Sequence, residues 1–186
     1  MIDPNDPEFQ RDLASFRQSR IGSMFAQLEG RIWHTTGVRA LLDIRSAGAI
    51  EPNRGQFSFT FPQTANSYAL AKGYVSLFDF ATPTDEQCIS FYMKWAGFFS
   101  HHKPCTVAIE VAMDRLPGRF IRNDHAKSEV GFNRVWIPWV EAWHDGPIPL
   151  SAFNGYLFIP TSRDDQPAWL AADDERVDQF IRTYEG

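Results

Sequence analysis

Hydrophobic residues recur at helical spacing near both ends of the chain. From Glu8 to Glu29 most of them return every three or four residues, and Gly30 follows, where a left-handed cap residue costs least. A second segment of this kind begins at Asp173. Its apolar positions are Val177, Phe180, Ile181 and Tyr184. Both patterns predict amphipathic helices that pack one face on a core.

After the first helix, the pattern predicts a strand and then another helix. Residues 31–35 form a short apolar run, and the spacing of apolar residues from Val38 onward is helical. Thr35 or Thr36 can cap this helix, and Gly48 closes it.

The next stretch alternates between strand and helix patterns. Phe57, Phe59 and Phe61 alternate with small polar residues, which is typical of a half-buried strand. Residues 64–72 predict one or two helical turns, and residues 74–80 are apolar enough for a central strand.

The second half of the chain opens with a helix start signal. Thr84 and Gln87 have the spacing of a capping box, and the helix they open continues to Phe99. The remaining assignments are a strand over 105–111, a polar loop over 114–133, and strands over 139–143 and 155–159. The elements add up to an α+β fold in one domain over 1–186, with an N-terminal helix over 1–30, a core over 31–160 and a C-terminal helix over 161–186.

Composition excludes several classes of protein. Hydrophobic residues make up 44% of the 186 residues and charged residues 22%, which is typical of a folded chain rather than a disordered one. No apolar run is long enough to span a bilayer, and the acidic N-terminus does not have the pattern of a secretory signal. Two cysteines suit a reducing compartment, so we expect a cytoplasmic protein. The net charge of −5 argues against a partner bound through phosphate backbones.

Three polar residues stand out because of their places in these elements. His34 closes the first strand, where it either binds a ligand or satisfies a backbone carbonyl. Glu141 lies among tryptophans, where its carboxylate is either desolvated and chemically useful or turned outward into water. Arg54 sits in a glycine-flanked turn, which suits an anion or phosphate and equally an ordinary exposed arginine.

We do not expect a metal site. His101, His102 and Cys105 have suitable side chains, but no second ligand pair follows nearby, and this favours a solvated turn. The sequence also has no glycine-rich nucleotide loop and no G-x-S-x-G or H-E-x-x-H motif.

The order of these features is similar to that of a known family. Residues 32–36 read Ile-Trp-His-Thr-Thr, and a helix with the spacing L-x-x-I-x-x-x-G follows them. The apolar strand over 73–80 comes next, and later come Glu141 and the segments 148–153 and 156–159. Over residues 31–160 this resembles the ADP-ribosyltransferase fold in its histidine-type branches, which include poly(ADP-ribose) polymerase-like enzymes, tRNA 2′-phosphotransferases and DNA-targeting ADP-ribosyltransferase toxins. The resemblance implies a split β-sheet core with helices packed on it.

The resemblance also implies that NAD is the substrate. His34 and Thr36 would hold the ribose next to the nicotinamide, and Arg54 would contact the pyrophosphate. The nicotinamide would stack on one aromatic ring, which is that of Tyr68, Tyr74 or Phe78.

A glutamate would stabilise the positive charge that develops on the ribose as nicotinamide leaves. Glu141 is the preferred candidate because an apolar strand and an Ile-Pro turn surround it, and Glu129 is the other candidate. Trp139 stands two residues before Glu141, so the acidic or glutamine partner of arginine-specific transferases is missing.

We therefore predict an NAD-dependent ADP-ribosyltransferase that modifies a macromolecular acceptor, either protein or nucleic acid, as bacterial toxins and effectors do. A cognate inhibitor protein is a further partner that the resemblance implies, and a membrane is not. Two alternatives stay open: a non-catalytic protein-interaction module on the same fold, and an RNA 2′-phosphotransferase-like enzyme, which the net charge disfavours.

Overall fold

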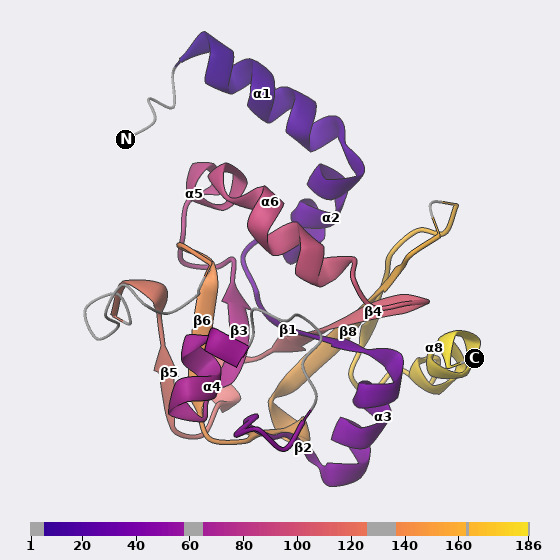
Figure 1. Ribbon diagram of the computed structural model, residues 1–186. Helices are drawn as coiled ribbons and strands as arrows, with labels where there is room; N and C mark the ends of the chain where they lie inside the picture. The colour runs from indigo at the N-terminus through magenta and orange to yellow at the C-terminus, as the bar shows by residue number, and fades with distance from the viewer. Residues whose placement is uncertain (1–5, 58–64, 126–136, 163, 186) are drawn as a thin grey trace.

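A seven-stranded antiparallel sheet runs through the protein, and helices pack against it (Figure 1). The computed structural model describes residues 6–57, 65–125, 137–162 and 164–185. The strand order is β5-β6-β3-β1-β4-β8-β9, and β2 and β7 form a separate two-stranded sheet. The predicted α+β class is confirmed. Among the described residues, none of the helices is long and apolar enough to cross a membrane.

The strands are β1 (Ile32–Gly37), β2 (Ala49–Ile50), β3 (Val75–Asp79), β4 (Cys105–Val111), β5 (Arg119–Ile121), β6 (Glu141–Asp145), β7 (Ile148–Pro149), β8 (Phe153–Pro160) and β9 (Ala168–Ala171). The α-helices are α1 (Pro7–Gln18), α2 (Arg20–Leu28), α3 (Val38–Ala47), α4 (Tyr68–Lys72), α5 (Asp85–Ser90), α6 (Tyr92–Trp95) and α8 (Val177–Tyr184). Short 3₁₀ helices are η2 (Ala96–Phe99), η3 (Met113–Arg115) and η4 (Leu150–Ala152).

The N-terminal helical segment is broken, so the prediction of one helix from Glu8 to Glu29 was wrong. Ser19 has extended backbone, ends α1, and caps α2 by accepting a hydrogen bond from the Gly22 N–H at 3.1 Å. The bend brings the two helices very close together, because a Cβ on Gly22 would lie 2.0 Å from the carbonyl oxygen of Phe16. A side chain at this position would prevent the approach.

The first strand is longer than predicted, and this changes how α3 begins. β1 pairs with β4 in register from Ile32 opposite Val111 to Gly37 opposite Thr106. The threonines therefore lie in the strand, and α3 starts after Gly37 without a side-chain cap. The predicted cap at Thr35 or Thr36 was wrong because pairing with β4 keeps these residues extended. The predicted closure at Gly48 is confirmed by its left-handed conformation.

The helical segment after β3 begins as predicted and then breaks. The capping box of Thr84 and Gln87 has both of its hydrogen bonds. Phe91 ends α5, so the predicted helix to Phe99 consists of α5, α6 and η2. Strand β5 lies within the stretch predicted as a polar loop over 114–133, and β9 was not predicted. The predicted strand over Phe57, Phe59 and Phe61 lies mostly outside the described residues.

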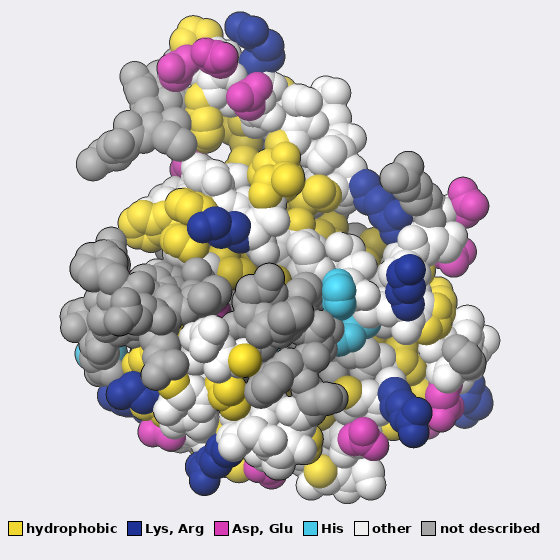
Figure 2. Space-filling model, in the orientation of Figure 1, with side chains coloured by type: hydrophobic (Ala, Val, Ile, Leu, Met, Phe, Trp, Pro, Cys, Tyr) yellow, Lys and Arg dark blue, Asp and Glu magenta, His cyan; other side chains and the backbone are white. Residues whose placement is uncertain are grey.

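Each face of the sheet has its own hydrophobic core. Ile32 and Val107 belong to a cluster that includes residues of α3 and α8. Trp33, the next residue along β1, belongs to a second cluster with residues of α1, α2 and α5. The indole N–H of Trp33 donates to Leu28 O at 2.9 Å and so ties α2 to the sheet. Figure 2 shows hydrophobic side chains at the surface of this helical layer, in the upper part of the view.

Candidate functional site

Strands β1 and β3 separate near the centre of the sheet. β1 pairs with β4 over six positions but with β3 only at Ile32–Asp79 and Trp33–Phe78. Beyond these positions a side chain connects the two strands, since His34 Nδ1 lies 3.0 Å from Ser76 O. The split in the sheet that the resemblance implies therefore begins at His34.

The geometry at the split fixes the hydrogen-bonding state of His34. Phe80 N–H donates to Arg31 O at 2.9 Å, so this backbone edge of β3 faces β1, and alternation places Ser76 O on the same edge. A carbonyl oxygen only accepts, so His34 Nδ1 donates. Burial lowers the pKa of His34, against the smaller effect of this hydrogen bond. The ring is thus neutral near pH 7, and its Nε2 is an acceptor.

Ser76 connects His34 to a second group, the carboxyl group of Glu141, which is buried. Ser76 Oγ donates to Glu141 Oε1 at 3.2 Å, and Ile137 N–H donates to Oε2 at 2.7 Å. Glu141 is only 7% exposed, so the outward orientation considered from the sequence does not occur. Burial raises the pKa of Glu141 to about 7 in spite of these hydrogen bonds. This carboxyl group therefore changes charge near neutral pH.

A tight turn leads into Glu141. Asn123 Nδ2 donates to Ile137 O at 3.1 Å and to Glu141 O at 3.2 Å, and Glu141 N–H donates to Ile137 O at 3.2 Å. Within the turn, Trp139 has a φ of 69° and is 42% exposed. Positive φ is unfavourable for a bulky residue, so these hydrogen bonds hold a strained backbone immediately before Glu141.

Aromatic rings pack beside Glu141. The rings of Tyr68 and Trp143 are 4.9 Å apart at 75°, and those of Tyr68 and Tyr74 are 6.0 Å apart at 71°. Of the three rings predicted to stack on nicotinamide, Tyr74 is partly exposed, whereas Tyr68 and Phe78 are 2% and 4% exposed. Phe78 packs against other rings of the core, Phe80, Phe98 and Phe99. Of these three rings, Tyr74 is thus the one with enough exposed surface to contact a ligand.

The other predicted residues occupy the surroundings of the split. Thr36 is buried on β1, two residues beyond His34. Arg54 lies over Gly73, since a Cβ there would be 3.1 Å from its Nε, and this places the guanidinium at the beginning of β3. Glu129 lies outside the described residues. The structure therefore links His34 and Glu141 through Ser76, and it places Arg54 near the start of the strand that carries Ser76.

Two residues at this site were missed by the sequence reasoning. Ser76 has a signal in the sequence, because it is a hydroxyl side chain within the apolar strand 74–80. His102 was not predicted to belong to this site, yet it lies at the end of β1, where a Cβ on Gly37 would be 3.1 Å from its Nδ1. Burial and the neighbouring His101 and His34 lower its pKa. Within residues 6–57, 65–125, 137–162 and 164–185, no group of three or more His, Cys, Asp or Glu residues could hold a metal ion.

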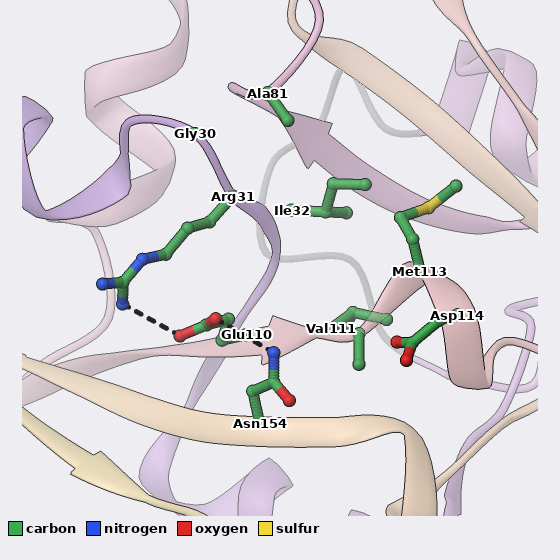
Figure 3. Close-up of a pocket in the computed structure, with 10 residues that line it drawn as sticks. Gly30, Arg31, Ile32, Ala81, Glu110, Val111, Met113, Asp114 and Asn154 are labelled. Carbon is green, nitrogen blue, oxygen red and sulfur yellow. Dashed lines mark hydrogen bonds and ion pairs between the residues drawn. The ribbon is translucent and has the colours of Figure 1, made fainter.

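A separate pocket of about 210 Å³ lies near the opposite end of β1 (Figure 3). On its floor, the Glu110 carboxylate accepts hydrogen bonds from Arg31 at 3.0 Å, Asn154 at 3.1 Å and Trp169 at 2.9 Å. The Arg31 guanidinium also lies over the rings of Trp33 and Trp169 at 6.0 and 5.6 Å. These contacts connect β9 with β4, with β8 and with the residue that precedes β1. None of the predicted site residues lines this pocket.

Comparisons with known proteins bear on the fold. No protein-family model matches this sequence, and no curated protein matches it. Among solved structures, the chain is similar to a single-site mutant of Escherichia coli heat-labile enterotoxin, with 15% identity and a TM-score of 0.42 over 83% of this chain and 81% of that chain. A double mutant of heat-labile enterotoxin gives 13% identity and a TM-score of 0.42 over 83% and 66% of the two chains. Both matches are to heat-labile enterotoxin, and they concern the fold alone.

Proposed function

We propose that this protein is an NAD-dependent ADP-ribosyltransferase that modifies a macromolecular acceptor. One observation carries the proposal: hydrogen bonds join His34 on β1, Ser76 on β3 and Glu141 on β6 at the place where the sheet splits. A neutral imidazole and a buried carboxyl group are thereby held on either side of one short strand segment. This pair suits a reaction in which a sugar is held by its hydroxyl groups while positive charge develops on it.

His34 supplies the ribose contact in this proposal. Because Nδ1 donates to Ser76 O, the neutral ring offers the Nε2 lone pair to a ribose hydroxyl. The tautomer is set by the backbone of β3 before substrate arrives, so the acceptor is pre-organised. Tyr74 is the candidate ring for stacking on nicotinamide, and Arg54 is the candidate contact for the pyrophosphate.

Glu141 supplies the electrostatic stabilisation. As the bond between the ribose carbon and the nicotinamide nitrogen breaks, its electron pair leaves with nicotinamide and positive charge develops on the ribose. The ionised carboxylate stabilises this charge, and it is held in place by Ser76 and Ile137. The acceptor nucleophile then bonds to the same carbon and loses a proton. Since the pKa of Glu141 is about 7, activity should rise with pH through neutrality.

The acceptor in this proposal is a protein or a nucleic acid, and the setting is that of a toxin or effector. The turn before Glu141 presents an exposed tryptophan, Trp139, where arginine-specific transferases carry an acidic residue or glutamine. This supports an acceptor other than an arginine side chain.

The test is release of nicotinamide from NAD with and without a cell extract as the source of acceptor. We expect slow release by the wild-type protein alone, and transfer of labelled ADP-ribose to one class of macromolecule in the extract. Glu141→Gln should lower turnover by roughly 10²–10³ while leaving NAD binding within a few fold.

Glu110→Gln is the matched control, because Glu110 is also a buried carboxylate of the sheet but lies at the separate pocket. It should retain turnover. Absence of NAD binding at millimolar concentration in calorimetry would refute the proposal, and binding without nicotinamide release by the wild type would favour a non-catalytic module.

A further inference from the structure

The indole nitrogen of Trp143 is a buried donor without an acceptor. It is the one buried side-chain nitrogen or oxygen among the described residues that lacks a hydrogen-bond partner. The other fully buried indoles are satisfied: Trp33 donates to Leu28 O at 2.9 Å, and Trp95 donates to Cys88 O at 2.8 Å. An indole N–H can only donate, and leaving it unpaired in the interior is unfavourable. Such an exception needs a reason.

The position of Trp143 supplies one. It follows Glu141 by two residues on β6, so both side chains lie on the same face of the sheet. In the pairing of β3 with β6, Ser76 lies opposite Trp143. The Ser76 hydroxyl group therefore lies beside the indole, and it donates to the Glu141 carboxyl group. The edge-on packing of Tyr68 at 4.9 Å holds the indole ring in place.

The carboxyl group has room for a further donor. Each oxygen of Glu141 accepts one hydrogen bond in this structure, from Ser76 Oγ and from Ile137 N–H. A carboxylate offers about four lone-pair positions, so two remain. A protonated carboxyl group needs fewer donors than a charged one, because the charge is what makes burial costly.

We propose that Trp143 is a positioning residue, whose indole N–H hydrogen-bonds to the Glu141 carboxylate once that group loses its proton. The consequence for catalysis rests on the function proposed above. The ionised carboxylate then has three donors, from Ser76, Ile137 and Trp143, which fix its orientation toward the ribose. Burial is the largest influence on the pKa of Glu141 and raises it, whereas the indole N–H of Trp143 is the smallest influence and lowers it. The other titratable groups described at this site are His34, His102, Tyr68 and Tyr74. Its cations are Arg54, Lys72, which lies 5.9 Å from the centre of the Tyr68 ring, and Arg119, which donates to Tyr74 Oη at 3.2 Å. The substitutions below leave all of these groups in place.

The experiment measures the titration of Glu141 directly. The protein is labelled with ¹³C at the glutamate carboxyl carbon, the Glu141 signal is assigned by its loss in Glu141→Gln, and its pKa is read from the shift with pH. Trp143→Phe keeps a ring and removes the donor, so the pKa should rise by about one unit. Trp95→Phe is the matched control. It also removes a buried indole N–H, but Trp95 ends α6 and belongs to the core cluster of the helical layer, so this variant should leave the Glu141 titration unchanged.

A second replacement guards against a packing defect in Trp143→Phe. Benzothienylalanine incorporated at position 143 has nearly the shape of tryptophan, with sulfur in place of the N–H, and it should raise the pKa by the same amount. In both variants the pH profile of kcat should move upward by that amount, with KM for NAD unchanged.

An unchanged Glu141 pKa in both variants would overturn the proposal. A fall in stability alone would then show that Trp143 acts through packing, and a rise in KM would show that it contacts the substrate. The titration uses the free protein, so it decides the role of Trp143 even if the wild-type protein releases no nicotinamide. In that case the proposed function fails separately.

Discussion

Replacing Glu141 by glutamine should remove a pH dependence of stability that this residue imposes. In the folded protein the pKa of Glu141 is about 7, against 4.5 as the ordinary value. A raised pKa means that the folded state keeps a proton which the unfolded state has released, between about pH 4.5 and 7. The stability gained from protonation is therefore complete below pH 4.5 and is lost as pH rises through 7. The difference of 2.5 units corresponds to about 3 kcal/mol.

The assay is urea unfolding followed by tryptophan fluorescence at steps from about pH 4 to pH 8.5. Relative to wild type, Glu141→Gln should gain up to about 3 kcal/mol between the two ends of this range. Any constant difference between a glutamine and a protonated glutamate cancels in this comparison. His34 has a lowered pKa and so destabilises the folded state as pH falls, but it is present in both proteins and cancels as well.

Glu51→Gln is the charge-matched control, because Glu51 is exposed just after β2. Its stability should run parallel to that of wild type over the whole range. If the curve of Glu141→Gln also ran parallel to wild type, Glu141 would not be held protonated by burial, and the account of the site given above would be refuted.

Three further predictions concern the backbone, two in the helical layer and one beside the site. Gly22→Ala should destabilise the protein by about 1–3 kcal/mol, because the added carbon would collide with Phe16 O, whereas Gly97→Ala, with no atom within 4 Å, should change the urea midpoint little. Thr84→Ala should cost about 1 kcal/mol by removing the cap of α5, and Thr84→Ser should restore most of it. Trp139→Gly should leave the free energy of unfolding the same or raise it by about 1 kcal/mol, because glycine adopts a φ of 69° without strain; a clear loss would show that the indole contributes more than the strain costs.

The sequence predicted the elements whose burial is visible in the spacing of their apolar residues. Alternation identified β4, the apolar run identified β3, and Gly48 marked the end of α3. The errors arose where a tertiary contact overrides the local signal. Ser19 breaks the first helix because the bend allows a close approach at Gly22, and β5 is too short to be recognised without its partner strand.

The candidate site divides in the same way. His34 and Glu141 could be recognised because each is a polar residue in an apolar element. Their link through Ser76 could not be predicted, because it depends on the register of β3 against β6 and on the separation of β1 from β3. The unpaired donor of Trp143 is likewise a property of the assembled sheet and has no counterpart in the local sequence.

The contact between His34 and Ser76 O restricts which side chains position 34 can accept. At this point a side chain supplies the donor that the main chain of a neighbouring strand would otherwise supply. Replacements that carry an N–H at a similar reach, such as glutamine or arginine, can keep the carbonyl of β3 satisfied. An aliphatic residue would leave the Ser76 carbonyl oxygen without this donor, or would favour further main-chain pairing between β1 and β3. The architecture of the sheet therefore favours a hydrogen-bond donor side chain at position 34, independently of any requirement of catalysis.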